Sequence, residues 1–214
     1  MSENETEGFR VLADLLPGAR DAASSQETTS PTNGPNTRPA RVRGVPIARL
    51  SDTFTTFDSK LNPSMRPALK QCQAVASGEA WCALLAGGYG NGKTHLAIAA
   101  MQAFGQNRSF FWKVPDFLEW VRERAYGDDK IPVDTLLRSY RDEHFLLVLD
   151  DLGAENATDW ASEQVYRVLD SRYDLSLPTI ITTNQSPDRI DPRIRSRFRA
   201  GLIACRGADI RAAR

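Results

Sequence analysis

The chain has 214 residues, of which 41% are hydrophobic, and its 27 Lys and Arg residues are balanced by 27 Asp and Glu residues. This length suits one domain with an appendage, and the zero net charge argues against a protein that binds nucleic acid by bulk charge. No apolar run approaches the roughly 20 residues of a transmembrane helix, the first residues are acidic, and the three cysteines lack a C-x-x-C pair. We therefore expect a soluble, cytoplasmic protein without a disulfide framework or a zinc site.

The first 42 residues differ in composition from the rest of the chain. Residues 18–40 are rich in Gly, Ser, Thr, Pro and Asn and contain no Val, Ile, Leu, Met or aromatic residue. Such a segment cannot bury enough surface to offset the entropy of ordering, so we predict that residues 1–42 are mostly disordered. Within them, Phe9–Leu16 places its apolar residues on one helical face, and this segment is either a short docking helix for a partner or a frayed end.

From residue 43 onward the pattern is that of one α/β domain, residues 43–214. Short, continuously apolar segments alternate with segments of helical periodicity, which is typical of a parallel sheet covered by helices on both faces. The predicted strands are Trp81–Leu85, Ser109–Lys113, Phe145–Asp150, Thr179–Thr183 and Gly201–Cys205. The predicted helices are Pro63–Ser77, Lys93–Phe104, Pro115–Tyr126, Val133–Tyr140, one through Ala161–Leu169 and one that begins at Pro192.

A glycine-rich segment follows the first predicted strand and opens the helix at Lys93. Its sequence, Gly87-Gly-Tyr-Gly-Asn-Gly-Lys-Thr94, matches the P-loop pattern G-x-x-x-x-G-K-[ST]. The glycines allow successive backbone N–H groups to point inward and form a nest for phosphate at the positive end of a helix. Lys93 would reach the β- and γ-phosphates, and the Thr94 hydroxyl would bind Mg²⁺. The predicted nucleotide-binding residues are Gly87, Gly88, Tyr89, Gly90, Asn91, Gly92, Lys93, Thr94 and His95.

An acidic pair ends the third predicted strand. Asp150 would lie at the carboxyl edge of the sheet beside the P-loop, where it can hold Mg²⁺ through water. Asp151 would then orient or deprotonate the water that attacks the γ-phosphate. Glu155, in the loop that follows, is either a second candidate for this base or a solvated loop residue.

The fourth predicted strand ends in Thr182-Thr183-Asn184. A polar side chain at the tip of a strand can contact the γ-phosphate or the attacking water. Asn184 is the first candidate for this role and Thr183 the second. Because Thr-Asn after a strand is otherwise a common start of a turn, the assignment depends on the other two motifs.

Taken together, three segments resemble AAA+ ATPases of the bacterial helicase-loader group, which includes the DnaC and DnaI loaders and the IstB-type transposition helpers. These segments are Gly87–Leu96, Leu149–Glu155 and Thr179–Asn184. The resemblance covers about residues 43–214 and implies a P-loop NTPase core of the AAA+ (ASCE) type, without a C-terminal lid domain, that uses ATP and Mg²⁺. Members often carry a helicase-binding or zinc-binding N-terminal domain, whereas residues 1–42 contain no Cys or His.

Two arginines follow the fourth strand at helical spacing. Arg193 and Arg197 are four residues apart on the helix that begins at Pro192, with Ile194 and Phe198 on the adjacent stripe. The resemblance implies a finger arginine in this segment, which would contact the γ-phosphate of ATP bound to a neighbouring protomer. We therefore predict that activity requires ATP-dependent self-association. The alternatives are a solvated basic face and a contact with DNA phosphate.

The segment between the second and third strands, Val114–His144, is long for a single crossover helix. The resemblance implies an extra helix here, which lines a channel for single-stranded DNA in helicase loaders and initiators. The residues available for such contacts are Arg122, Arg124, Lys130, Arg138 and Arg141 for phosphate and Tyr126 or Tyr140 for base stacking. The segment also carries many acidic residues, so a solvated hairpin is an equal alternative. Trp112 and Trp120 are expected in the core.

These observations favour an ATP-binding and ATP-hydrolysing AAA+ protein that acts in DNA replication as a helicase loader or remodelling factor, with a replicative helicase as its partner. The alternative within the same fold is an IstB-type helper ATPase for a transposase. A P-loop kinase for a small molecule is less favoured, because such kinases usually need a lid with catalytic arginines. A switch that binds nucleotide without turnover is disfavoured by the intact Lys93, Asp150 and Asp151. No membrane partner is expected.

Overall fold

The computed structural model describes residues 41–42, 44–154, 158–207 and 209. Glu155, the candidate docking helix Phe9–Leu16 and the rest of the predicted disordered segment up to residue 40 lie outside the described residues. Among the described helices, none is long and apolar enough to cross a membrane.

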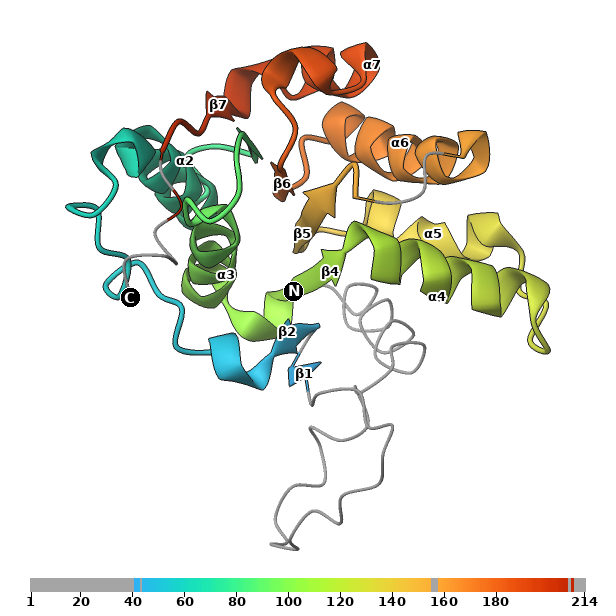
Figure 1. Ribbon diagram of the computed structural model, residues 1–214. Helices are drawn as coiled ribbons and strands as arrows, with labels where there is room; N and C mark the ends of the chain where they lie inside the picture. The colour runs from blue at the N-terminus through green and yellow to red at the C-terminus, as the bar shows by residue number, and fades with distance from the viewer. Residues whose placement is uncertain (1–40, 43, 155–157, 208, 210–214) are drawn as a thin grey trace, which may run out of the picture.

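A sheet of five parallel strands forms the centre of the molecule, with the strand order β4-β5-β6-β3-β7 (Figure 1). The strands are β3 (Cys82–Ala86), β4 (Ser109–Lys113), β5 (Leu146–Leu152), β6 (Thr179–Thr183) and β7 (Leu202–Ala204). β6 therefore lies between β3, which precedes the P-loop, and β5, which carries the acidic pair. The predicted fold class, a five-stranded parallel sheet between helices, is confirmed.

Helices cover both faces of the sheet. They are α2 (Arg66–Ser77), α3 (Lys93–Phe104), α4 (Val114–Tyr126), α5 (Val133–Asp142), α6 (Asp159–Asp174) and α7 (Pro192–Arg197). Short 3-10 turns lie at Ile47–Arg49, Pro63–Met65, Gln106–Arg108, Pro187–Arg189 and Arg199–Gly201. α2 and α3 cover one face and α4, α5 and α6 the other (Figure 1).

The continuous apolar runs of the strands follow from this two-sided cover. In β3, Leu84 and Ala86 point into the core under α4 to α7, whereas Ala83 and Leu85 point into the core under α2 and α3. Since both faces are dry, every position of the strand is apolar and buried. The continuous apolar pattern of the strands therefore predicted correctly that helices cover both faces of the sheet.

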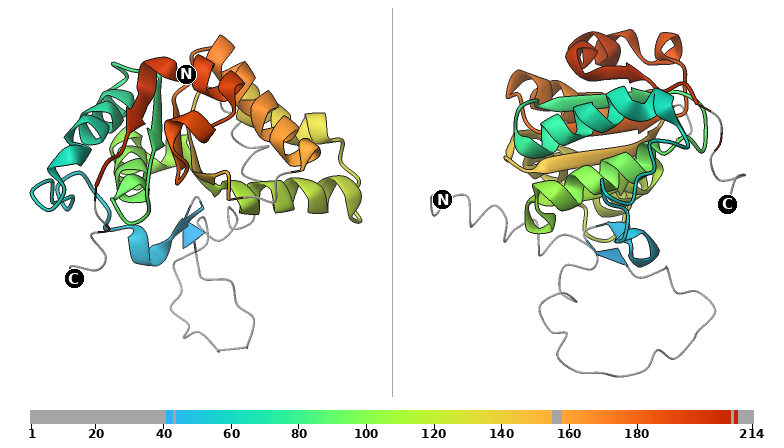
Figure 2. Two further views of the ribbon diagram at one scale, coloured as in Figure 1. Left: turned by 45° about the horizontal axis from the view of Figure 1, so that its top comes forward. Right: turned by 90° about the vertical axis from the view of Figure 1, so that its left-hand side faces the viewer.

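The boundaries of several elements differ from the prediction. β3 lies one residue later than predicted, and β7 is one residue shorter at each end. β5 begins at Leu146 and continues through the acidic pair to Leu152. A short antiparallel pair that was not predicted, β1 (Arg41–Val42) and β2 (Val45–Pro46), lies on the opposite side of the molecule from α7 (Figure 2). Its turn requires glycine, because Gly44 has φ of 87° and a Cβ there would lie 1.8 Å from the carbonyl oxygen of Phe111.

A fully buried arginine ties the helices to the amino ends of two strands. Arg172 of α6 donates hydrogen bonds to the carbonyl oxygens of Tyr140, Phe145 and Pro178, at 2.8, 2.6 and 2.8 Å, and to Thr179 Oγ1 at 2.9 Å. Burial lowers the pKa of its guanidinium group to about 9. The charge is thus stabilised by neutral acceptors that come from the ends of α5, β5 and β6.

Candidate functional site

The P-loop has the backbone geometry of a tight anion nest. It connects β3 to α3, and Gly87, Gly90 and Gly92 have φ angles of 142°, 70° and 98°. A Cβ on Gly92 would lie 2.7 Å from Cε2 of Phe57, so this position needs glycine for both its conformation and its neighbour. The nest that the sequence predicts is therefore present at the start of α3.

Lys93 lies over the loop and is buried. Its Nζ donates hydrogen bonds to the carbonyl oxygens of Gly87, at 2.7 Å, and Gly88, and to Asn91 Oδ1 at 3.1 Å. Asn91 is itself buried, and its Nδ2 donates to the carbonyl oxygen of Cys205 at 3.2 Å. Asn91 thus fixes the loop to the segment after β7 and also positions the ammonium group of Lys93.

Asp150 accepts hydrogen bonds from two hydroxyl groups on one carboxylate oxygen. Thr94 Oγ1 of α3 lies 2.9 Å from Asp150 Oδ1, and Thr182 Oγ1 of β6 lies 2.6 Å from the same atom. Burial raises the pKa of Asp150, as does the charge of Asp151, while the two hydroxyl donors oppose this shift. A threonine hydroxyl next to a carboxylate is an oxygen set that suits Mg²⁺, so Thr94 and Asp150 fit the predicted metal site.

Asp151 contacts the tip of β6 and the end of β4. Asn184 Nδ2 donates to Asp151 Oδ1 at 3.0 Å, and Lys113 Nζ lies 3.9 Å from Asp151 Oδ2. The backbone N–H of Asp151 donates to Thr182 Oγ1 at 3.1 Å. The pairing of β5 with β6 shifts register between Leu149 and Leu152, and Asp151 has φ of 61°. This irregularity allows two consecutive carboxylates to lie at the same edge of the sheet.

The structure thus brings together the predicted residues and adds two that the sequence analysis did not assign. Thr182 joins Asp150 to the backbone of Asp151, and Lys113 places a cation near the second carboxylate. Thr183, the second candidate beside Asn184, donates instead to the carbonyl oxygen of Leu152 at 2.7 Å. The sequence held no distinct signal for Thr182, because β6 contains three threonines, at positions 179, 182 and 183.

His95 contacts the segment that precedes α2 and not the inside of the P-loop. Its Nε2 lies 2.9 Å from the carbonyl oxygen of Thr53, its Nδ1 lies 3.5 Å from Asp52, and its ring packs edge-on against Phe57. Gln102, two turns further along α3, donates to the carbonyl oxygens of the same segment. The side chain of His95 thus holds this segment against α3, and its contact with a nucleotide stays a prediction.

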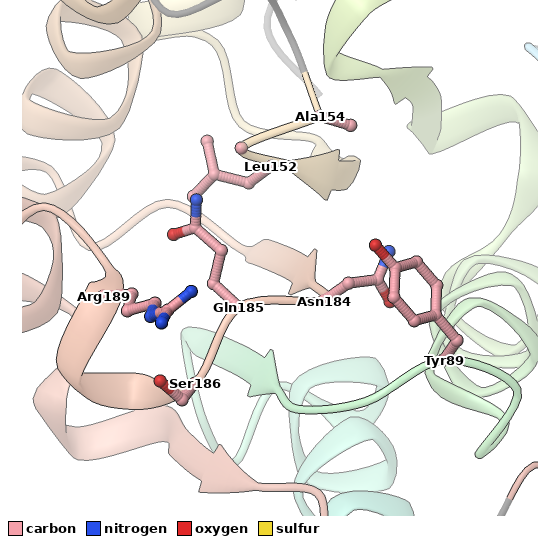
Figure 3. Close-up of a pocket in the computed structure, with 8 residues that line it drawn as sticks. Tyr89, Leu152, Ala154, Asn184, Gln185, Ser186 and Arg189 are labelled. Carbon is pink, nitrogen blue, oxygen red and sulfur yellow. The ribbon is translucent and has the colours of Figure 1, made fainter.

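An open cavity of about 520 Å³ adjoins the tip of β6 (Figure 3). The P-loop contributes Tyr89, whose side chain is 68% exposed, and the segment after β6 contributes Asn184, Gln185 and Arg189. Its remaining lining residues are Leu152, Gly153, Ala154 and Ser186. The cavity therefore leaves Asn184 accessible to a side chain from outside this chain.

Arg193 and Arg197 lie on α7 and contact α6. Arg193 Nη2 pairs with Asp191 at 2.9 Å, and its Cζ lies 4.2 Å from the centre of the Tyr166 ring. Arg197 forms an ion pair with Asp170, and its Cζ lies 5.0 Å from the same ring. Their contacts with the described residues involve α6 and α7, so the structure does not bring them to the P-loop of their own chain.

The region proposed for DNA contacts contains two helices, α4 and α5, as the resemblance implied. Tyr140 cannot stack on a base: it is fully buried, and its hydroxyl accepts a hydrogen bond from Trp112 Nε1 at 3.2 Å. This prediction was wrong because Tyr140 belongs to the apolar stripe of α5. Trp112 and Trp120 are in the core, as predicted.

The exposed part of this region is smaller than the sequence indicated. Arg124 pairs with Asp129 and Arg141 with Asp134, each at 2.9 Å. Tyr126, 67% exposed, packs edge-on against Trp160 of α6. The guanidinium group of Arg122 lies over the Trp160 ring, with Cζ 5.0 Å from its centre.

The strand order, the P-loop after β3, the acidic pair on β5 and the polar tip of β6 together define a P-loop nucleotide-binding protein with the AAA+ fold. Residues 38–192 match the family model of the IstB-like ATP binding proteins. The chain therefore belongs to the IstB-like ATP-binding family.

Known proteins with similar sequences act in replication. The chain is 28% identical over 192 residues to the chromosomal replication initiator protein DnaA of Nostoc punctiforme, a match that covers 84% of this chain and 40% of that protein. It is 35% identical over 109 residues to the replicative helicase loader DnaI of Bacillus subtilis, covering 50% of this chain and 34% of the loader. The chain thus spans well under half the length of these curated relatives.

The fold is shared with a solved helicase loader. The crystal structure of the DnaC helicase loader superposes with a TM-score of 0.63 at 24% identity, and the match covers 75% of this chain and 99% of that one.

Proposed function

We propose that this protein hydrolyses ATP and acts in DNA replication as a helicase loader or remodelling factor. The observation that carries the proposal is the continuous set of contacts Thr94–Asp150–Thr182–Asp151–Asn184 at the carboxyl edge of the sheet. This set supports the proposal because it holds two neighbouring carboxylates next to the P-loop, one bonded to threonine hydroxyls and the other to an amide. The similarity to DnaA and DnaI supports a role in replication.

The P-loop would bind the phosphates of ATP, and the acidic pair would bind Mg²⁺ and activate water. The loop N–H groups and Lys93 would hold the phosphates, and Thr94 and Asp150 would hold Mg²⁺, which neutralises charge on the phosphate oxygens. Asp151 would accept the proton of the attacking water. Asn184, hydrogen-bonded to Asp151 Oδ1, would keep that carboxylate in place.

Hydrolysis would be completed by a neighbouring copy of the chain. Arg193 and Arg197 contact α6 and not their own P-loop, and an open cavity adjoins Asn184, so an arginine from a second protomer has access to the γ-phosphate. Arginine suits this role because its planar, delocalised cation matches phosphate oxygens.

The base is tested with Asp151→Asn, which should bind ATP normally and hydrolyse it at least about 100-fold more slowly, because an amide cannot accept the proton. The matched control is Asp188→Asn, a carboxylate whose side chain is 96% exposed. ATP hydrolysis is measured by a coupled assay for released phosphate, and ATP affinity is measured by calorimetry. Wild-type turnover in Asp151→Asn would show that another residue is the base.

The trans arginine is tested with Arg193→Ala and Arg197→Ala, and the control is Arg195→Ala on the same helix. One or both of the first two should lose about 10³-fold or more in turnover without losing ATP affinity, since an arginine finger supplies about 10³–10⁵ in rate. Mixing the slow variant with Lys93→Ala should restore activity, because one chain then supplies the site and the other the arginine. No restoration, together with activity that is independent of protein concentration, would refute the assembly model.

The partner is tested by capture from the native cell with the tagged full-length chain. Recovery of a hexameric helicase supports the loader, and recovery of a transposase supports the second candidate, an IstB-type transposition helper, which the matching family favours. Recovery of neither argues against both. For single-stranded DNA, we propose the surface formed by the exposed Arg122 and Tyr126 and the partly buried Trp160. Tyr126→Ala should weaken binding of a fluorescent oligonucleotide, and an unchanged affinity would exclude this surface.

A further inference from the structure

α7 lies across a single stripe of α6. Glu163, Tyr166, Asp170 and Tyr173 are spaced by three or four residues and therefore share one face of α6. On the other side, α7 is anchored by Ile194 and by Phe198 directly after the helix, both of which are buried in the core under α4 to α6. This anchorage leaves the two arginines of α7 to lie against the α6 stripe.

One aromatic ring holds both arginines. The guanidinium carbons of Arg193 and Arg197 lie 4.2 and 5.0 Å from the centre of the Tyr166 ring, within the range of about 6 Å for a cation–π contact. Asp170 adds a second tie, because its Oδ1 accepts a hydrogen bond from the Tyr166 hydroxyl at 3.1 Å and pairs with Arg197. Tyr166 and Asp170 thus fix each other and the cations.

Both guanidinium groups keep donors that can reach outward. Among the described residues, no acceptor is hydrogen-bonded to Nη2 of Arg197. In the same part of the chain, the partner of Arg193 Nη1 is the carboxylate of Glu163, at 3.9 Å. The side chains of Arg193 and Arg197 are 49% and 29% exposed. The stripe therefore orients the arginines without enclosing them.

We propose that Tyr166 is a positioning residue for the trans arginines: its ring holds Arg193 and Arg197 on the face of α7 before a neighbouring copy of the chain presents its bound ATP. A free arginine loses side-chain entropy when a phosphate fixes it, whereas one already held against a ring has lost that freedom beforehand. The same ring sets the spacing between the two guanidinium groups. This role rests on the proposed function, because it serves arginines that act on another chain.

The test compares Tyr166→Leu with Tyr166→Phe. Leucine removes the ring, and kcat should fall at least about tenfold, towards the roughly 100-fold loss that a misplacement of about 1 Å produces. KM for ATP and ATP-dependent assembly, measured by sedimentation, should stay unchanged. Phenylalanine keeps the ring and should retain kcat within about threefold. Equal loss in both variants, or a fall in assembly that accounts for the loss in kcat, would overturn the positioning role.

Mixing experiments locate the defect. Tyr166→Leu has an intact ATP site, so adding Lys93→Ala, which has an intact arginine face, should restore turnover. Adding whichever of Arg193→Ala and Arg197→Ala is slow by itself should not restore it, since neither chain then supplies that arginine in its proper place. If the arginine variants are slow and Tyr166→Leu is not, only the positioning role is wrong. If the arginine variants and Tyr166→Leu all turn over at the wild-type rate, the trans arginine and its positioning are wrong together.

Discussion

Replacing Asp150 by asparagine should stabilise the nucleotide-free protein while removing its response to Mg²⁺ and ATP. Asp150 is 1% exposed, and burial raises the pKa of its carboxyl group. Because the folded pKa lies above the unfolded one, the folded state binds more protons than the unfolded state between these two values. The free energy of unfolding therefore falls as the pH rises through this window, and the full penalty is present above the folded pKa.

The magnitude follows from the contacts of this carboxylate. A buried ion costs several kcal/mol in desolvation. Against this, Asp150 accepts hydrogen bonds from Thr94 and Thr182, and each is stronger by about 1 kcal/mol for a charged acceptor than for an amide oxygen. Asparagine keeps both acceptor contacts without the charge, so we expect a net gain of about 1–3 kcal/mol, or about 2–12 °C in Tm for a chain of this size.

The assay is thermal unfolding with and without Mg²⁺ and ATP. At about 1,000 times its Kd, the nucleotide should stabilise the wild type by about 4.1 kcal/mol and Asp150→Asn by much less, so the order of stability should reverse. The difference between the nucleotide-free proteins should narrow as the pH falls towards the folded pKa. A nucleotide-free variant that is less stable than the wild type, or one that keeps the full nucleotide response, would refute the reasoning. Asp188→Asn, an exposed carboxylate, is the control and should change stability by less than about 0.5 kcal/mol.

Three further substitutions probe the P-loop and the fold. Lys93→Ala should weaken ATP binding about 10- to 100-fold in calorimetry, because charge-assisted contacts contribute about 1.5–3 kcal/mol and about 1.4 kcal/mol corresponds to a factor of ten; an unchanged affinity would contradict the P-loop assignment. Gly92→Ala should lower Tm and ATP affinity, since φ is 98° and the methyl group would meet Phe57, and an unchanged Tm would show that the loop relaxes freely. Arg172→Met should lower the free energy of unfolding in urea by at least about 3 kcal/mol, because it leaves several buried carbonyl oxygens without a donor; a loss below about 1 kcal/mol would mean that water replaces the guanidinium group.

The sequence was sufficient where function depends on neighbours in the chain. Lys93 and Thr94 belong to one contiguous motif, and Asp150 is recognisable because a buried strand ends in an acidic residue. Each of these residues is where the motif predicts because the strand and the helix that carry it have strong, local patterns. The same holds for the layers of the sheet, which the continuous apolar runs reveal.

The sequence was insufficient where function depends on which strands lie side by side. Thr182 contacts Asp150 because β6 lies between β3 and β5, and this order is set by tertiary packing. Lys113 approaches Asp151 for the same reason, through the pairing of β4 with β5. Tyr140 was misjudged because an aromatic residue on a polar helix can belong to either face, and packing decides which.

The left-handed backbone at Asp151 limits which amino acids can occupy this position. An L-residue at φ of 61° costs roughly 1–2 kcal/mol, and Asn and Asp tolerate this conformation better than other non-glycine residues. Glutamate offers a carboxylate of similar basicity, yet it would bear the strain and would have to fold a longer side chain into the space beside Asn184. If Asp151 is the base that we propose, the backbone thus restricts this role to aspartate by shape and not by proton affinity. Random mutation at this codon should accordingly yield folded proteins mainly with Asp, Asn or Gly, and only aspartate among them can take up a proton from water.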